Sequence, residues 1–126
     1  MGVLDNYLGV SATALKARAQ RMDLIASNIA NVATPNYKAR DIDFASALKD
    51  AQGASLQRSN ASHLGPIGGA SAQAGYRVPQ QSSLDGNTVE LASEQVAFSE
   101  NAVRYEATLS VLNGRIGTLM SAIKGE

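Results

Sequence analysis

The chain of 126 residues contains no cysteine and no tryptophan, and it has a single histidine, His63. The absence of cysteine excludes disulfide scaffolds, thiolate zinc sites and thiol nucleophiles. One histidine leaves no partner for a two-histidine metal site or for a histidine-dependent catalytic relay. We therefore expect no metal site, no cofactor and no catalytic residue.

An excess of one charge is also missing, because eleven Lys and Arg residues balance eleven Asp and Glu residues. Nucleic acids and anionic membranes attract a cationic surplus, so we expect no nucleic-acid partner. No stretch approaches the ~18 apolar residues of a membrane span, so direct membrane insertion is not expected either. The first residues lack the basic and apolar regions of a secretory signal peptide, which by itself favours a cytoplasmic protein.

Aromatic residues make up only 5% of the chain, although its length suits one domain of ordinary size. Aromatic side chains supply much of the buried area of small domains, so this fraction is thin for a core that one chain builds alone.

A seven-residue apolar repeat is present at both ends of the chain. The first part carries a row of large residues, Leu8, Leu15, Met22 and Ile29, and a row of alanines, Ala12, Ala19, Ala26 and Ala33. The last part carries Leu91, Phe98, Ala102, Tyr105, Leu109, Leu112, Ile116, Leu119 and Ile123. These rows predict a mainly α fold, in which long helices over 4–33 and 89–124 pack as an antiparallel coiled-coil-like pair. We expect the alanines to face the large residues of the second helix.

Residues 51–82 form a different kind of sequence, rich in glycine, serine and alanine and without a sustained period. This composition predicts a long irregular loop that orders on assembly, with a possible short strand at Tyr76–Val78. Residues 1–50 and 83–126 are then expected to form one helical core domain.

The stretch after the first helical repeat predicts a helix end followed by a turn. Asn28 and Asn31 lie three residues apart, where their amides can bond freed backbone carbonyls or a neighbouring chain. Pro35 ends the helix. The segment Thr34-Pro35-Asn36-Tyr37 suits a type II turn with a left-handed third residue.

Two further segments carry turn and cap chemistry. Asp41 and Asp43 precede Phe44 in a pattern that predicts an N-capped short helix with Phe44 packed inward. The turn sequence Asp85-Gly86-Asn87 precedes the last helix, and Asn87 with Glu90 three residues later predicts a capping box.

The stretch from Ala26 to Phe44 resembles the amino-terminal signature of the flagellar axial proteins, the rod and hook subunits. Its usual form is Ala-Asn-x-x-Asn-x-x-Thr-Pro-Gly-Tyr-Lys, and this chain has Ser27 for the alanine and Asn36 for the glycine. Asparagine is the second-best residue for a left-handed position, so the turn tolerates this change. The segments 40–44 and 83–89, together with the short length, narrow the resemblance to the proximal rod subunits.

The resemblance implies a structural subunit of the motor drive shaft and no enzyme. It implies contacts with other copies of itself, with other rod proteins and with the rod adaptor protein at the membrane ring. It also implies passage through the flagellar type III export apparatus and polymerisation in the periplasmic space, which reverses the cytoplasmic expectation. The absence of cysteine suits a chain that settles in an oxidising compartment.

The apolar surface on the two helices is wider than a lone hairpin can hide, so we expect a subunit that neighbours stabilise. The residues assigned to packing in the assembly are Leu8, Leu15, Met22, Ile29, Phe98, Tyr105, Leu109, Leu112, Ile116 and Leu119. The alternative is a cytoplasmic helical adaptor or export chaperone, which shares the repeats but does not need the Thr-Pro turn. An enzyme is disfavoured, because a helix cap explains the one close carboxylate pair, Asp41 and Asp43.

Overall fold

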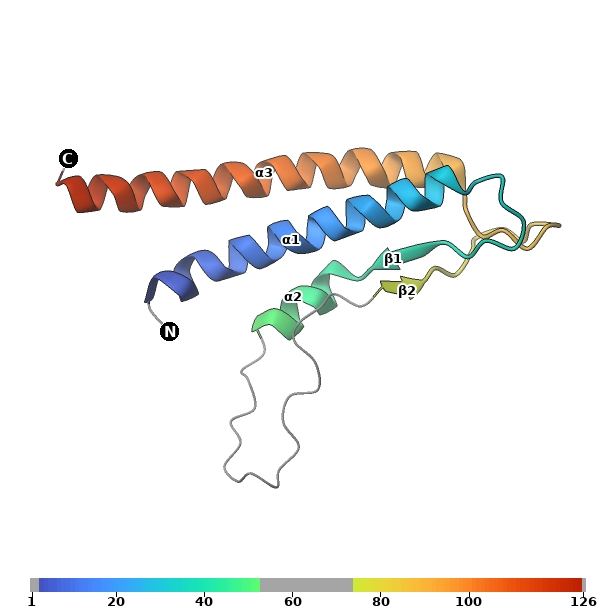
Figure 1. Ribbon diagram of the computed structural model, residues 1–126, viewed down its shortest axis with the longest axis horizontal. Helices are drawn as coiled ribbons and strands as arrows, with labels where there is room; N and C mark the ends of the chain where they lie inside the picture. The colour runs from blue at the N-terminus through green and yellow to red at the C-terminus, as the bar shows by residue number, and fades with distance from the viewer. Residues whose placement is uncertain (1–2, 53–73, 126) are drawn as a thin grey trace, which may run out of the picture.

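A computed structural model describes residues 3–52 and 74–125 of the chain. The elements in chain order are α1 (Val3–Ala30), β1 (Arg40–Ile42), α2 (Phe44–Gln52), β2 (Ala74–Tyr76) and α3 (Leu91–Lys124). The two long helices run in opposite directions, close together where α1 ends and α3 begins and further apart toward the chain termini (Figure 1). The predicted mainly α fold with a long antiparallel helix pair is confirmed.

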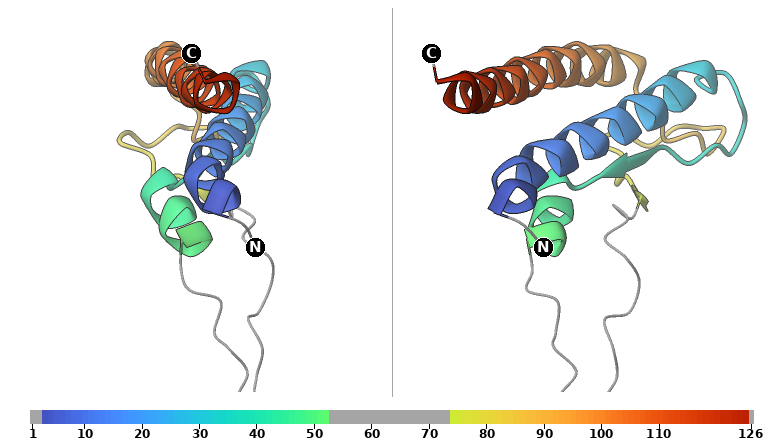
Figure 2. Two further views of the ribbon diagram at one scale, coloured as in Figure 1. Left: turned by 90° about the vertical axis from the view of Figure 1, so that its left-hand side faces the viewer. Right: turned by 60° about the vertical axis from the view of Figure 1, so that its left-hand side comes forward.

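The helix α1 lies between α3 and a second layer formed by α2 and the two strands (Figures 1 and 2). It packs against α3, α2 and β1. One long helix therefore carries most of the contacts that hold the described part of the chain together.

Each long helix is two residues shorter than the helix predicted for it over 4–33 or 89–124. Val3–Ala30 ends before the turn that contains Pro35, and α3 begins at Leu91 rather than at residue 89. At its other end α3 stops at Gly125, which adopts a left-handed φ of 75° and donates its N–H to the Ser121 carbonyl at 3.0 Å. A glycine in this conformation is a common helix terminator.

The strands β1 and β2 pair antiparallel, with Asp41 opposite Gly75 at the centre of the register. The predicted short strand exists, but it covers Ala74–Tyr76 and shares only Tyr76 with the expected segment. The expected loop over 51–82 overlaps the end of α2, which reaches Gln52, and it contains β2, which begins at Ala74. Residues 53–73 of that expectation lie outside the described residues.

The contact line between α1 and α3 differs from the predicted one. All four alanines of the predicted row, Ala12, Ala19, Ala26 and Ala33, are exposed, so the expectation that they face α3 is wrong. The buried positions of α1 are instead Ser11, Ala14, Ala17, Ile25 and Asn28. The row of large residues Leu8, Leu15, Met22 and Ile29 is half-buried beside this line.

On α3 the fully buried positions are polar, namely Glu94 and Asn101, each with no exposed surface. Because these side chains lie against α1, the apolar row of α3 is turned partly to the surface. The sequence pattern predicts that the apolar row of α3 contacts α1, because apolar periodicity reports hydrophobicity and not the specific hydrogen bonds between two helices.

Candidate functional site

The two motif segments, residues 31–39 after α1 and residues 83–89 before α3, meet at the end of the helix pair. We call these two segments the motif junction. Backbone bonds cross it, because the Asn36 N–H donates to the Asp85 carbonyl at 2.9 Å and the Thr88 N–H to the Tyr37 carbonyl at 3.0 Å. The junction therefore joins parts of the chain that lie about fifty residues apart in the sequence.

Asn87 is the central side chain of the motif junction and is 6% exposed. Its Nδ2 atom lies 3.0, 2.8 and 2.9 Å from the carbonyl oxygens of Asn31, Val32 and Thr34. Its Oδ1 atom accepts the Val89 N–H at 2.8 Å. Asn87 thus supplies a side-chain donor to three carbonyls of the turn that follows α1, two of which also accept backbone N–H groups.

The prediction that Asn87 caps α3 is wrong. The N-cap residue of α3 is Glu90, which has an extended backbone and makes no side-chain capping bond. Its carboxylate instead accepts the N–H groups of Gln80 and Gln81 at 2.9 and 3.1 Å. The amide of Asn87 is drawn toward the end of α1, where several carbonyls converge.

A tight turn shapes the first half of the junction. Asn36 has a φ of 59°, which confirms the left-handed third position predicted for the Thr34–Tyr37 turn. The Tyr37 N–H closes this turn on the Thr34 carbonyl at 3.3 Å. Gly86 has a φ of 74°, and a Cβ atom there would lie 2.5 Å from Oδ1 of Asn36. Glycine is therefore favoured at residue 86 because of its left-handed backbone, and any other residue would also have to displace the Asn36 side chain.

The two motif asparagines, Asn28 in α1 and Asn31 directly after it, both donate to backbone carbonyls of the same chain, which is one of the two alternatives that the sequence left open. Asn28, which has no exposed surface, donates to the Arg40 carbonyl at 2.8 Å and accepts the Arg40 N–H at 3.0 Å. Asn31 donates to the Ser27 carbonyl at 2.8 Å and accepts the Thr34 hydroxyl at 3.1 Å. Asn28 therefore fixes β1 against α1, and Asn31 closes the end of the helix.

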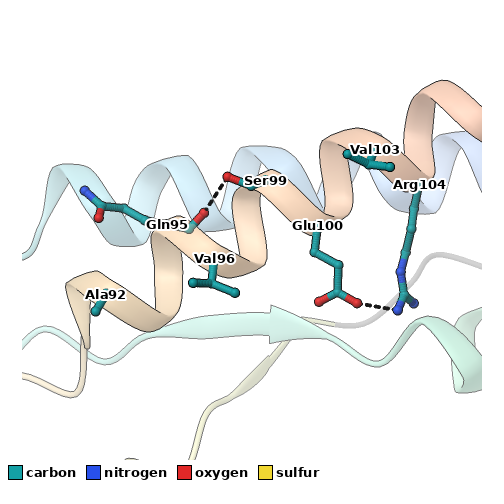
Figure 3. Close-up of a pocket in the computed structure, with 7 residues that line it drawn as sticks. All are labelled: Ala92, Gln95, Val96, Ser99, Glu100, Val103 and Arg104. Carbon is teal, nitrogen blue, oxygen red and sulfur yellow. Dashed lines mark hydrogen bonds and ion pairs between the residues drawn. The ribbon is translucent and has the colours of Figure 1, made fainter.

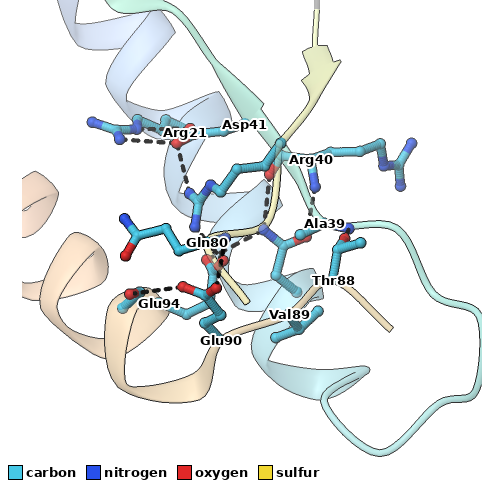
Figure 4. Close-up of polar contacts among 12 residues, drawn as sticks. Arg21, Ala39, Arg40, Asp41, Gln80, Thr88, Val89, Glu90 and Glu94 are labelled. Carbon is cyan, nitrogen blue, oxygen red and sulfur yellow. Dashed lines mark hydrogen bonds and ion pairs between the residues drawn. The ribbon is translucent and has the colours of Figure 1, made fainter. Parts of the chain in front are cut away.

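Four charged residues form a cluster between the elements, and we call Arg21, Asp41, Arg77 and Glu94 the charge cluster. Arg21 of α1 binds Asp41 of β1 through two bonds of 2.8 and 3.0 Å, and the two side chains point toward each other in Figure 4. Arg77 bonds Asp41 at 2.7 Å and also pairs with Glu94 of α3. The cluster ties both helices to the segment that follows β2.

The charges in the cluster shift the pKa of two members. Burial alone would raise the pKa of Asp41, but hydrogen bonds from Arg21, from Arg77 and from the Ile42 N–H together lower it below its ordinary value. The hydrogen bond to Asp41 raises the pKa of Arg21. Both groups are therefore held in their charged forms.

The two aspartates of the motif have different tasks, which corrects the prediction that both serve a helix cap. Asp43 caps α2, because its Oδ1 accepts the Ala45 N–H at 3.0 Å and its carbonyl accepts the Ala47 N–H at 3.0 Å. Asp41 lies in β1 and binds arginines instead. Phe44 is half-buried, with the Arg18 guanidinium 4.1 Å above its ring.

Polar side chains at intervals of seven residues connect α3 to α1, and we call Glu94, Asn101, Thr108 and Arg115 the polar ladder. Glu94 accepts from Asn28 at 3.2 Å, and Asn101 donates to the Arg18 carbonyl at 2.9 Å. The other two bonds join Thr108 to the Arg18 guanidinium at 3.1 Å and Arg115 to the Ser11 hydroxyl at 3.0 Å. The closest line between the long helices is therefore hydrogen-bonded along its length.

The residues assigned to packing in the assembly lie beside this ladder. The half-buried ones are Leu8, Leu15, Met22, Ile29, Tyr105, Leu112 and Leu119, and the exposed ones are Phe98, Leu109 and Ile116. Further exposed apolar residues on α3 are Val96, Val103, Val111, Met120 and Ile123. Large apolar side chains thus remain at the surface along most of α3.

The outer face of α3 also carries a groove, whose lining comes from that helix alone (Figure 3). Val96 and Val103 in this groove are each 68% exposed. Glu100 and Arg104 form an ion pair with each other across one helical turn. The groove therefore combines exposed valines with charges that are already paired.

Within residues 3–52 and 74–125, no three His, Cys, Asp or Glu side chains gather in a way that could hold a metal ion. None of the helices described has the length and apolar character needed to cross a membrane.

No motif of the sequence marks Arg21, Arg77, Glu94 or Asn101 as functional. The polar ladder could have been found from its spacing, because Glu94, Asn101, Thr108 and Arg115 recur every seven residues, with the same period as the apolar row of α3. No local pattern announces Arg77, whose partners lie 36 and 17 residues away in the sequence.

Comparison with known proteins gives a consistent family. The family model described as "Flagella basal body rod protein" matches residues 8–38. The protein named flagellar basal body rod protein FlgB from Cereibacter sphaeroides is 54% identical over 123 residues, which cover 96% of either chain. Proteins of the same name are 41% identical in Salmonella typhimurium, over 97% of this chain and 96% of the relative, and 42% identical in Escherichia coli, over 96% and 95%.

Proposed function

The chain belongs to the FlgB family of flagellar basal body rod proteins, and on that premise we propose that it is a non-enzymatic structural subunit of the proximal rod. The proximal rod is the inner part of the motor drive shaft. In this proposal the subunit polymerises with other copies of itself and with other rod proteins, and it contacts the rod adaptor protein at the membrane ring.

The observation that carries this proposal is the apolar surface of α3. Leu109 and Ile116 are 37% and 39% exposed, and Val96 and Val103 are 68% exposed. Exposed apolar patches of this kind on a folded chain mark interaction surfaces. An assembly in which neighbouring subunits cover these residues stabilises each subunit by mass action.

The motif junction and the packing rows have separate tasks in this proposal. The junction holds the helix pair together at one end, and the packing rows contact neighbouring subunits. In the assembled rod, residues 1–50 and 83–126 form the helical core.

Export is the remaining part of the proposal. The chain crosses the inner membrane through the flagellar type III apparatus and assembles in the periplasmic space. A chain without cysteine forms no disulfide on the way or in that oxidising compartment.

Cell fractionation tests the proposal directly. A tagged copy that restores motility in a strain lacking its own gene should co-purify with detergent-extracted basal bodies. A cytoplasmic adaptor or export chaperone would stay in the cytoplasmic fraction, and that result would reject the rod assignment. A matched strain that cannot assemble the membrane ring provides the control, because the subunit should then be absent from the basal-body fraction.

A further inference from the structure

The polar ladder occupies the side of α3 that lies against α1. Glu94 and Asn101 have no exposed surface, and Thr108 and Arg115 are half-buried. Each ladder residue has a hydrogen bond to a residue of α1 between Ser11 and Asn28. These bonds fix which side of α3 faces its partner helix.

The apolar row of α3 is displaced by this arrangement. Leu109 and Ile116 directly follow the ladder residues Thr108 and Arg115, so each points about 100° away from the ladder around the helix axis. Their exposed fractions of 37% and 39% agree with that direction. Turning α3 by about half of that angle would bring both residues toward α1 and would carry the ladder away from it.

We propose that the polar ladder holds α3 rotated about its own axis, so that Leu109 and Ile116 stay at the surface rather than in the seam of the helix pair. The hydrogen bonds to α1 oppose the rotation that apolar burial favours. The ladder residues are therefore positioning residues. Their effect on assembly rests on the proposed function, whereas the rotation itself does not.

Asn101 shows that the ladder is not the most stable seam for one chain. Its Nδ2 atom bonds the Arg18 carbonyl, but its buried Oδ1 atom has no hydrogen-bond partner among the described residues. A buried polar atom without a partner is destabilising, and well-packed apolar residues often replace buried polar groups with equal or greater stability. The hydrogen-bonded contact between α1 and α3 is thus less stable in the single chain than an apolar contact would be, and it leaves the apolar row of α3 at the surface.

The test uses the full chain with a reporter thiol. Because the chain has no cysteine, Ile116→Cys introduces one reactive group on the displaced row. The seam variant Asn101→Leu with Thr108→Val is compared with the parent chain, and Ser99→Leu with Ser110→Val places similar apolar groups on exposed positions as the control. The single variant Asn101→Leu provides a milder change of the same kind.

In the seam variants we expect the rate of thiol modification to fall several-fold and the melting temperature to rise by about 5 °C. The control should change neither quantity. An unchanged modification rate, a lower melting temperature or a loss of helix would each overturn the proposal. The seam variant should also reduce motility, and slower modification with normal motility would reject the assembly role of the row while leaving the rotation in place.

Discussion

Asn36 and Gly86 face each other across the motif junction, where Oδ1 of Asn36 occupies space that a Cβ atom at residue 86 would need. The distance to such a Cβ atom is 2.5 Å, and Asn36 and Gly86 both have left-handed backbones. The two motif segments of the sequence therefore depend on each other for their local conformation.

Gly86→Ala should lower the free energy of unfolding by about 1–2 kcal/mol through the left-handed backbone alone, and further through the contact with Asn36. Urea denaturation measures this change. Adding Asn36→Gly should recover the part that the contact contributes, because it removes the side chain that the new methyl group meets. Gly75→Ala is the control, since a Cβ atom there would meet no other atom within 4 Å. Equal losses for Gly86→Ala with and without Asn36→Gly would contradict this explanation.

Substitutions at Asn36 alone should separate by backbone preference. Asn36→Gly should leave motility and stability unchanged or slightly improved, because glycine adopts a φ of 59° without strain. Asn36→Val should impair both, because a β-branched residue strongly disfavours this conformation. Motility on soft agar and thermal melting measure the outcome. Equal motility and equal melting temperatures of the two variants would show that the left-handed turn at residue 36 is not needed for folding or assembly.

Asn87→Ala should lower the free energy of unfolding by about 1–3 kcal/mol, because it removes a buried hydrogen-bond donor. The carbonyls that lose this donor are those of Asn31, Val32 and Thr34. Leu84→Ala in the same segment is the control, since Leu84 is fully exposed. Thermal melting followed by circular dichroism compares the two variants. Similar melting temperatures for both variants would show that Asn87 does not hold the junction.

Asp41 should make the stability of the chain depend on acid pH. Its pKa is lowered in the folded state, so its stabilising contribution is complete above the unfolded value of about 4 and is lost as the pH falls through the lower folded value. Asp41→Asn should lower the free energy of unfolding by about 1.5–3 kcal/mol at pH 7. The difference from the parent chain should shrink below about pH 4.

Urea denaturation at several pH values between 7 and 2.5 checks this dependence. Glu100→Gln is the control, because Glu100 and Arg104 form an exposed pair whose loss should change stability by less than about 1 kcal/mol. A difference between the parent chain and Asp41→Asn that stays constant down to pH 2.5 would contradict the assignment.

Leu109→Asp should block incorporation into the rod while leaving export intact and the fold of the single chain nearly unchanged. The side chain is already 37% exposed, so a charge there is partly solvated in the monomer but would be buried and unpaired between subunits. Motility and the amount of exported subunit are measured together. Ser110→Asp is the matched control at an exposed neighbouring position, and normal motility of Leu109→Asp would reject a role for this row in assembly.

The helices and the turn were predictable because each depends on neighbouring residues. Seven-residue rows mark helices, Pro35 marks an end, and Asn36 tolerates a left-handed φ. Asp43 was correctly assigned as a cap because the N–H groups that it accepts lie only two and four residues ahead, on Ala45 and Ala47.

The rotation of α3, the role of Asn87 and the charge cluster were not predictable in this way. Asn87 caps a helix that ends 57 residues earlier in the sequence, and its own segment matches a capping box equally well. Asp41 and Glu94 acquire their partner Arg77 only when β2 pairs with β1. A local sequence pattern does not show which of several residues far away in the sequence will become a hydrogen-bond partner.

The hydrogen-bonded seam also determines how the single chain responds to denaturant and heat. The buried apolar side chains among the described residues are Ile25, Ile42 and three alanines, Ala14, Ala17 and Ala39. The denaturant slope and the heat capacity change of unfolding both scale with the surface that unfolding exposes. The isolated subunit should therefore unfold over a broad range of urea concentration and with a small heat capacity increment, and both quantities should increase once neighbouring subunits cover α3.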